Sequence, residues 1–259
     1  MAENLVRRRG LAEVLAADTA DLYVEQRAIA ETLQRSLLPR QIPSLPGLVV
    51  AVRYAPGVGG IEVGGDWYDV IPTGPGRAVF VVGDVSGRGL SAATTMAYLR
   101  HAIRAYTAQG GGPAVILTKL GELVGQPEDG YFATVLCGSL DVDCHLLTVA
   151  SAGHFAPLVI DGGTARYVDM EVGPPIGVLP QTGPAEVTIT VPPGAALVVV
   201  TDGLVERRGE HLDVGLARLA EVAADHRGSI DDLLGRLLVD LAPAGSDDDI
   251  AILGVQWQA

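Results

Sequence analysis

The stretch VFVVGDVSGRGLSAATT, residues 79–95, changes its pattern at Asp84 and thereby decides how the chain is organised. A run of apolar β-formers ends at this aspartate, and a glycine-rich turn then opens a segment of small residues typical of a helix. Two kinds of site share that order. A glycine turn can cradle the phosphates of a nucleotide, whereas a carboxylate at the end of a buried strand can bind a metal ion.

The surroundings of the glycine turn argue against a nucleotide. GRGLSA, residues 87–92, has the G-x-G-x-x-A spacing of a dinucleotide site, but such a site needs a second strand that ends in an acid about 20 residues later. That distance falls in TAQGGG, at the end of a helix. Asp84 would also place a negative charge beside the pyrophosphate, so the metal-binding interpretation is favoured.

The composition favours a soluble globular protein and excludes several partners. The 259 residues are 48% hydrophobic and 19% charged, with a net charge of −13, whereas nucleic-acid binding requires a basic face. No apolar run is long enough to span a bilayer, and LAEVLAADTADL carries three acids and is no signal-peptide core. We therefore expect a cytoplasmic protein without nucleic-acid binding or membrane insertion, in which Cys137 and Cys144 are buried reduced thiols.

Helices come in pairs between blocks of strands. Residues 11–38 predict one helix that Pro39 ends, with an apolar stripe of Leu11, Leu15, Leu22, Ile29, Leu33 and Leu37. Such a stripe is buried either on the main domain or against a second copy of the chain. Beyond it, apolar strands and two further helix pairs, around residues 91–124 and 214–241, predict an α+β sandwich and not a regular βαβ alternation.

Aspartates lie beside glycines at the ends of the apolar strands: Asp66, Asp69, Asp84, Asp202, Asp247, Asp248 and Asp249. If the strands are buried, these carboxylates meet at the sheet ends, where an uncompensated cluster would repel itself. A divalent cation relieves that repulsion, and ligands that are all oxygen favour Mg²⁺ or Mn²⁺ over zinc. The alternative is that Asp and Gly are simply common turn residues.

The order of the motifs resembles a known family. LQRSLLP, VGGDWYD, GDVSGRG, SAGH, GPPIGV, TDGLVE and DDIAIL follow one another between Leu33 and Val255. In this order they are similar to the SpoIIE/RsbU-like branch of the metal-dependent PPM (type 2C) serine/threonine protein phosphatases. The resemblance implies a four-layer αββα sandwich, in which helix pairs flank two antiparallel sheets. It also divides the chain into a connector or regulatory helix, residues 1–38, and a phosphatase domain, residues 39–259.

The resemblance further implies a site for two Mn²⁺ or Mg²⁺ ions. Asp84 matches the carboxylate that bridges both ions, and the carbonyl of Val85 adds a ligand. Asp66 matches a ligand of one ion, and Asp202 and Asp248 match ligands of the other. The run of three aspartates leaves Asp249 as a register alternative to Asp248. These residues would act through metal-activated water, which hydrolyses phosphoserine or phosphothreonine without a phosphoenzyme.

Three other residues near these motifs have two interpretations each. Asp69 would either orient a metal-bound water or protonate the leaving group, or it caps its turn. His154 is tempting as a general acid, but ordering of its loop is the interpretation we favour. Arg88 either contacts the substrate phosphate or is a solvated turn residue. No arginine precedes Asp66 in GGIEVGG, where eukaryotic members of the family carry a phosphate-binding one.

The resemblance finally implies partners. The expected substrate is a phosphorylated STAS-domain anti-anti-sigma factor in a bacterial partner-switching pathway that controls a sigma factor. The helix of residues 11–38 would receive the signal of a sensor domain or activator, or join two chains in a homodimer. Two alternatives to a protein phosphatase are a catalytically silent binding module of the same fold and a phosphatase of small molecules.

Overall fold

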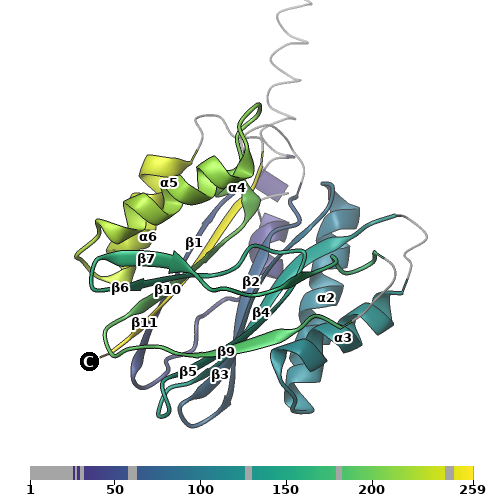
Figure 1. Ribbon diagram of the computed structural model, residues 1–259. Coiled ribbons are helices and arrows are strands. Elements are labelled where there is room, and N and C mark those ends of the chain that lie inside the picture. Colours follow the sequence, from purple (N-terminus) through teal and green to yellow (C-terminus); the bar gives the residue numbers. More distant parts are fainter. Residues whose placement is uncertain are drawn as a thin grey trace, which may run out of the picture.

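The computed structural model describes residues 26, 28–29, 32–57, 63–125, 130–178, 183–242 and 248–258. Two β-sheets lie face to face at its centre, and helices cover the outer face of each sheet (Figure 1). This arrangement confirms the α+β sandwich that the sequence predicts.

The first sheet has the strand order β1-β11-β10-β6-β7, and all its neighbouring strands are antiparallel. Its strands are β1 (Leu48–Ala55), β6 (Leu158–Asp161), β7 (Thr164–Tyr167), β10 (Ala196–Val200) and β11 (Ile250–Trp257). The helices that pack on this side are α4 (Asp202–Val205), α5 (Leu212–Ala224) and α6 (Ile230–Leu241). Their apolar faces, including Leu219, Leu234 and Leu237, bury the outer face of the sheet.

The second sheet has the order β2-β3-β4-β5-β8, with β9 also paired to β5. Its strands are β2 (Trp67–Gly74), β3 (Arg77–Val85), β4 (Ala133–Asp141), β5 (Leu146–Ala152), β8 (Val172–Gly173) and β9 (Glu186–Thr190). Helices α2 (Leu90–Ala108) and α3 (Pro113–Val124) cover its outer face.

One pairing departs from the predicted antiparallel sheets. β8 runs parallel to β5, with Ser151 opposite Val172. The chain reaches β8 from β7 of the first sheet and not through a hairpin, so nothing forces the antiparallel direction that a short turn imposes.

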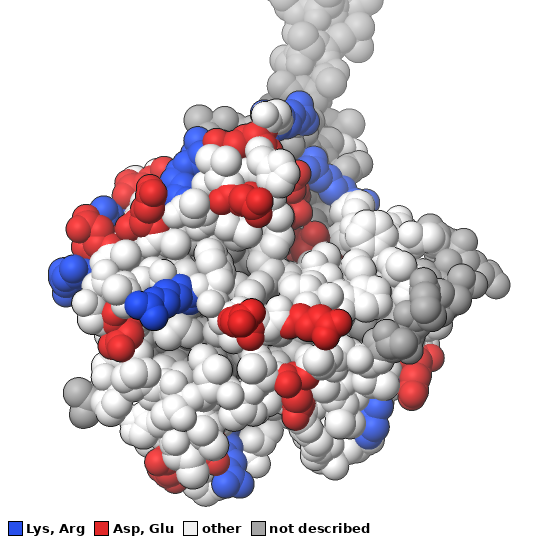
Figure 2. All heavy atoms as spheres, in the orientation of Figure 1, with Lys and Arg blue, Asp and Glu red and all other residues white. Residues whose placement is uncertain are grey.

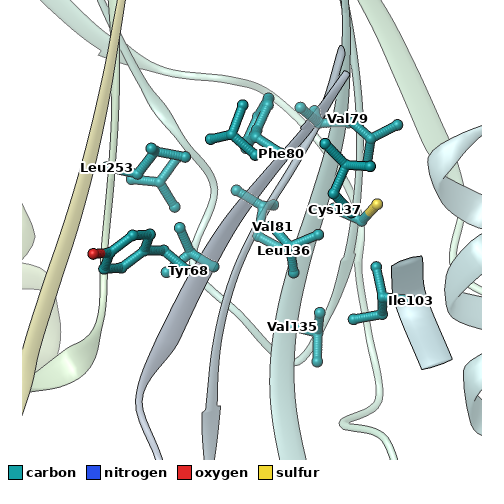
Figure 3. Close-up of a cluster of buried hydrophobic side chains, with 14 of the residues drawn as sticks. Tyr68, Val79, Phe80, Val81, Ile103, Val135, Leu136, Cys137 and Leu253 are labelled. Atoms are coloured by element: carbon teal, nitrogen blue, oxygen red, sulfur yellow. The ribbon is translucent and has the colours of Figure 1, made fainter. Parts of the chain in front are cut away.

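The core lies between the sheets and under the helices (Figure 3). Val81 of β3 is opposite Cys137 of β4, and Ile103 of α2 packs on that side, whereas Leu253 of β11 lies across from Tyr68. Because β3 is covered on both faces, residues 78–82 are all buried, and the sequence there is a continuous apolar run.

Cys137 is buried as expected, but the prediction for Cys144 is wrong, because that thiol is exposed. Cys144 lies in the turn between β4 and β5, where its backbone N–H donates to Asp141 and no core reaches it.

The predicted N-terminal helix is described only in part. Residues 32–37 are helical, and the helix ends before Pro39. Gln34 and Leu38 are buried there, whereas Ile29 of the predicted stripe is 61% exposed. Leu11, Leu15 and Leu22 lie outside the described residues.

Two further properties concern the surface. On the face shown in Figure 2, the acidic and basic side chains of the described residues are interspersed, and the basic ones do not merge into one area. Among the described helices, none combines the length and apolar character needed to cross a membrane.

Candidate metal centre

Three of the predicted aspartates converge at one end of the sandwich. One carboxylate oxygen from each of Asp66, Asp84 and Asp202 lies within 4.8 Å of the other two. Asp66 directly precedes β2 and Asp84 lies near the end of β3, and the antiparallel register that pairs Trp67 with Gly83 brings these two aspartates opposite each other. Asp202 follows β10 and begins α4 in the other sheet layer. The centre is therefore built from both sheets.

Burial and mutual repulsion dominate the electrostatics of the first pair. Asp66 is 1% exposed, and its Oδ2 atom has no hydrogen-bond partner among the described residues. Its pKa is raised well above the usual range by burial and then by the charges of Asp84 and Asp202, against a hydrogen bond from Thr201 that acts in the opposite direction. Burial also raises the pKa of Asp84, and the nearby charges of Asp248 and Asp249 add to the effect.

Asp202 shows the same behaviour. Burial raises its pKa to about 7, and the charges of Asp84 and Asp248 contribute further. Three carboxylates with raised pKa values in one place are each less stable in the charged form than in water. Every donor of this group is a carboxylate oxygen, and one oxygen is buried without a partner, so the site fits a hard divalent cation such as Mg²⁺ or Mn²⁺.

Asp248 lies at the rim of the centre and outside the group of three. Its side chain is 50% exposed, and its Oδ1 atom lies 3.4 Å from Nη2 of Arg88. Its charge nevertheless raises the pKa of both Asp84 and Asp202, so it is close enough to influence them. Arg88 is paired with this carboxylate in the structure, and its contact with a substrate phosphate stays a prediction.

Asp249 has a different environment from its neighbour. It is buried, and its Oδ2 atom accepts hydrogen bonds from the Tyr54 hydroxyl at 2.5 Å and from Nε2 of Gln34 at 2.5 Å. Its Oδ1 atom accepts the backbone N–H of Gly57 at 2.8 Å. Three hydrogen bonds thus hold Asp249 in a buried position, whereas Asp248 lies half exposed at the rim. Which of the two would bind a metal ion stays a prediction. Asp247 lies outside the described residues.

Val85 ends β3 next to the group of three. Its backbone N–H donates to the carbonyl of Gly65 at 3.2 Å, which ties the loop before Asp66 to the strand that carries Asp84. The carbonyl of Val85 as a metal ligand stays a prediction.

Asp69 lies outside the group of three. It is 1% exposed, and it accepts a hydrogen bond from Nε of Arg100 at 2.9 Å and two from Nη1 of Arg104 at 2.8 Å. Because both oxygens are engaged by arginines of α2, this carboxylate anchors α2 to β2.

His154 has the environment of a structural residue. It is 3% exposed, with Nε2 lying 3.0 Å from the carbonyl of Val200 and Nδ1 lying 3.0 Å from Oγ1 of Thr134. A carbonyl only accepts, so Nε2 carries the proton and Nδ1 accepts from the threonine. Burial lowers the pKa of the imidazole to about 4, which keeps it neutral near pH 7.

The sequence interpretation missed four residues that support the centre: Gln34, Tyr54, Arg100 and Arg104. The sequence could have indicated Gln34, because it lies four positions before the apolar Leu38 and so shares its side of the helix. A glutamine that is buried with Leu38 must find a hydrogen-bond partner. The two arginines are spaced four residues apart and thus share one face of α2, but nothing in the sequence connects that face with Asp69.

Comparison with known proteins identifies what this arrangement is similar to. The sequence profile of the family described as Stage II sporulation protein E (SpoIIE) matches residues 74–258. The phosphoserine phosphatase RsbU of Bacillus subtilis is 25% identical over 185 residues, which are 71% of this chain and 54% of RsbU.

Two solved structures share the fold. A structure of the RsbU and RsbW domains of Rv1364c from Mycobacterium tuberculosis is 32% identical, covers 86% of this chain and 63% of that one, and has a TM-score of 0.74. The SiaA-PP2C domain of Pseudomonas aeruginosa is 20% identical, covers 94% of this chain and all of that domain, and has a TM-score of 0.75. The chain spans about half the length of RsbU, so these matches concern one part of the longer relatives.

Proposed function

Because the chain belongs to the SpoIIE family and has the PP2C phosphatase fold, we propose that it is a metal-dependent serine/threonine phosphoprotein phosphatase. The observation that carries this proposal is the convergence of Asp66, Asp84 and Asp202 from both sheets on one point. A binding module without catalysis has no need for three like charges in one place, of which Asp66 is buried, because neutral residues there would be more stable.

The residues that would hold two Mn²⁺ or Mg²⁺ ions are the three converging aspartates, the carbonyl of Val85 and Asp248 at the rim. When bound, such ions lower the pKa of water and offset the charge of the phosphoryl oxygens. The chain itself supplies the oxygen ligands, of which Asp66 is buried, Asp84 and Asp202 are partly buried, and Asp248 lies half exposed at the rim. It also supplies Arg88 beside Asp248, whose guanidinium has the geometry to bind a substrate phosphate.

The proposed substrate is a phosphoserine or phosphothreonine of a STAS-domain anti-anti-sigma factor. Two findings support this. The relative RsbU is a phosphoserine phosphatase, and the mycobacterial relative joins an RsbU domain to an RsbW domain in one chain. We further propose that residues 39–259 form the phosphatase domain, and that residues 1–38 transmit the signal of a sensor, an activator or a second copy of the chain.

The test is single-turnover dephosphorylation of a phosphorylated STAS-domain protein, with Mn²⁺ titrated and an EDTA control. Asp202→Asn should reduce phosphate release by more than about 100-fold, since removal of one catalytic ligand typically costs several kcal/mol. The matched control is Asp161→Asn, an exposed aspartate at the end of β6 that should keep full activity.

Three outcomes would contradict the proposal in different ways. Full activity of Asp202→Asn would remove that aspartate from the site. No release by the folded wild-type protein at saturating Mn²⁺ would favour the silent binding module. Efficient turnover of p-nitrophenyl phosphate without preference for the phosphoprotein would favour a phosphatase of small molecules.

A further inference from the structure

Phe132 is an exposed aromatic residue that is fixed beside the candidate metal centre. Its backbone N–H donates to Oγ of Ser86 at 3.0 Å, and its carbonyl accepts the backbone N–H of Ser86 at 2.8 Å. Ser86 lies two positions after Asp84, so these bonds tie Phe132 to the segment that carries a candidate ligand. Phe132 is nevertheless 44% exposed, although an aromatic ring of this size is usually buried.

The strand register places Phe132 on the face of the sheet that carries Asp84. Asp84 of β3 is opposite Thr134 of β4. Side chains alternate between the two faces of a strand, and residues opposite each other share a face. Phe132 precedes Thr134 by two positions, and its two hydrogen bonds to Ser86 continue the same ladder. The ring therefore lies on the side of the sheet where the carboxylates converge.

Two other exposed apolar side chains lie on segments next to Phe132 and the glycine turn. Leu90 begins α2 directly after that turn and is 67% exposed. Val178 is 39% exposed and lies two positions after Ile176, which pairs with the first residue of β4. We call Leu90, Phe132 and Val178 the apolar rim. No charged side chain occurs in the described segments that carry it, residues 89–94, 131–134 and 174–178.

The segments of the apolar rim are held against one another. Ile176 and Ala133 exchange two backbone hydrogen bonds, of 2.9 and 3.0 Å. A Cβ on Gly87 would lie 3.2 Å from Cε1 of Tyr131, so the tyrosine ring packs directly on the glycine turn. A partner that meets a surface already held in this way loses less conformational entropy on binding.

The position of the apolar rim indicates which partner it fits. Only Cβ and Oγ lie between the backbone of a phosphoserine and its phosphorus, so the backbone of a substrate must come up to the mouth of the site. The residues that flank the phosphoserine then contact the surface around that mouth. The centres of protein interfaces are poor in charged residues and rich in aromatic ones, as the apolar rim is. A second copy of the chain seated there would close the site to its substrate.

We propose that the apolar rim is a docking surface for the phosphoprotein substrate, where it binds apolar side chains that flank the phosphoserine or phosphothreonine. This inference rests on the proposed phosphatase function and adds the surface that selects a protein over a small phosphate ester. The rim contributes to the binding of the substrate and of the transition state alike. Its loss should therefore raise KM and leave kcat nearly unchanged.

The experiment measures steady-state kinetics of the full chain at saturating Mn²⁺ with two substrates, a phosphorylated STAS-domain protein and p-nitrophenyl phosphate. The rim variants are Phe132→Ser and Leu90→Ser. The matched control is Val239→Ser, because Val239 is 81% exposed on α6, which packs on the first sheet. The thermal midpoint of each variant verifies its fold, and sedimentation velocity gives its oligomeric state.

The expected result is a rise of about tenfold in KM for the phosphoprotein in each rim variant, which is about 1.4 kcal/mol. The kcat for the phosphoprotein should stay within twofold of the wild type. Turnover of p-nitrophenyl phosphate should also stay within twofold, because this small ester does not reach the apolar rim. Val239→Ser should match the wild type with both substrates.

Several outcomes would overturn the inference. One is a KM for the phosphoprotein within twofold of the wild type in both folded rim variants. Another is an equal loss with both substrates, because the apolar rim would then act on the site itself. If the rim variants lose a self-association of the wild type while their phosphoprotein kinetics are unchanged, the rim binds a second copy of the chain instead.

Failure of the proposed function gives a separate result. A folded wild-type protein that hydrolyses neither substrate would overturn the proposed phosphatase, and this inference with it. A wild-type protein that hydrolyses only p-nitrophenyl phosphate would support a phosphatase of small molecules and overturn the docking surface.

Discussion

At the scale of single residues, the buried carboxylates of the centre oppose folding in the absence of a cation. The pKa of Asp202 is raised from its ordinary value to about 7, so its neutral form is favoured in the folded protein. A group with a raised pKa weakens the fold as pH rises from the unfolded to the folded pKa, here from about 4 to about 7. Above that pH range Asp202 is charged in the folded protein as well, and its whole destabilising effect on the free energy of unfolding is present.

Asp202→Asn should therefore make the metal-free protein more stable while it abolishes metal-dependent activity. We expect a gain of about 2–4 kcal/mol in the free energy of unfolding at pH 8, since one pKa unit corresponds to 1.36 kcal/mol. The gain should shrink toward zero as pH falls to 4. Urea unfolding of the wild type and of Asp202→Asn, in EDTA at pH 8 and at pH 4, measures the gain and its decrease. Equal stability of the wild type and the variant at pH 8 would refute the assigned environment of Asp202.

His154 should give the opposite pH dependence. Its pKa is lowered to about 4 by burial, so the neutral form stabilises the folded protein above the unfolded value of 6.5. That stabilisation is lost as pH falls from 6.5 to 4, and the loss amounts to about 3 kcal/mol.

His154→Gln keeps a donor for Val200 and an acceptor for Thr134 but cannot be protonated. Its unfolding free energy should be lower than that of the wild type at pH 7, and it should fall less between pH 6.5 and 4. Thermal unfolding at half-unit steps of pH gives the difference between the two curves. Parallel curves would show that His154 does not titrate on unfolding in this range.

At the scale of the elements, the ion pair between β2 and α2 should matter more than ion pairs on the surface. The Arg100 side chain is only 12% exposed, and it holds the buried carboxylate of Asp69 together with the carbonyl of Leu37. Removal of one partner of a buried pair typically costs 3–5 kcal/mol. Arg104 remains as a second partner of Asp69 and reduces that cost.

Arg100→Ala is accordingly expected to lower the free energy of unfolding by about 2 kcal/mol. The control is Arg77→Ala, which removes an ion pair with Asp141 in which the arginine is 66% exposed, and which should cost less than about 0.5 kcal/mol. Chemical denaturation of both variants compares them directly. Equal losses in the two variants would contradict an anchoring role for Arg100.

The elements also show which parts of the fold and of the site can be predicted from the sequence. The sandwich is predicted by the two helix pairs and by continuous apolar runs such as residues 79–82. A strand that is buried on both faces has apolar residues at consecutive positions. The same reasoning places Asp66, Asp84 and Asp202 at strand ends, and antiparallel register then brings them together. Such features are local in the chain, which is why the sequence reveals them.

Features that depend on contacts between residues far apart in the sequence could not be predicted. Gln34 and Asp249 are 215 positions apart, and Tyr54 and Asp249 are 195 apart. No periodicity links such pairs, so the donors of Asp249 emerge only from the fold. The parallel β8 and the exposed Cys144 are missed for a related reason, because each depends on where a connection runs and not on the pattern of the residues within it.

At the scale of the whole molecule, the metal centre joins the two sheets, since its candidate ligands come from both. A cation that binds only when Asp66, Asp84 and Asp202 are assembled binds the folded protein and not the unfolded chain. It must therefore stabilise the entire sandwich by mass action. It also removes the repulsion that raises the pKa values of these three residues.

Mn²⁺ at about 100 times its dissociation constant should add about 2.7 kcal/mol to the stability of the protein. For a domain of this size, that gain corresponds to a rise of about 5–10 °C in the thermal midpoint. The measurement is differential scanning calorimetry in EDTA and at increasing Mn²⁺. Asp161→Asn should show the same rise, whereas Asp202→Asn should show a clearly smaller one, because it starts from a relieved site and lacks a ligand of one ion. An equal rise in Asp202→Asn would mean that Mn²⁺ stabilises the molecule from some other place, and that the two sheets are not joined through this centre.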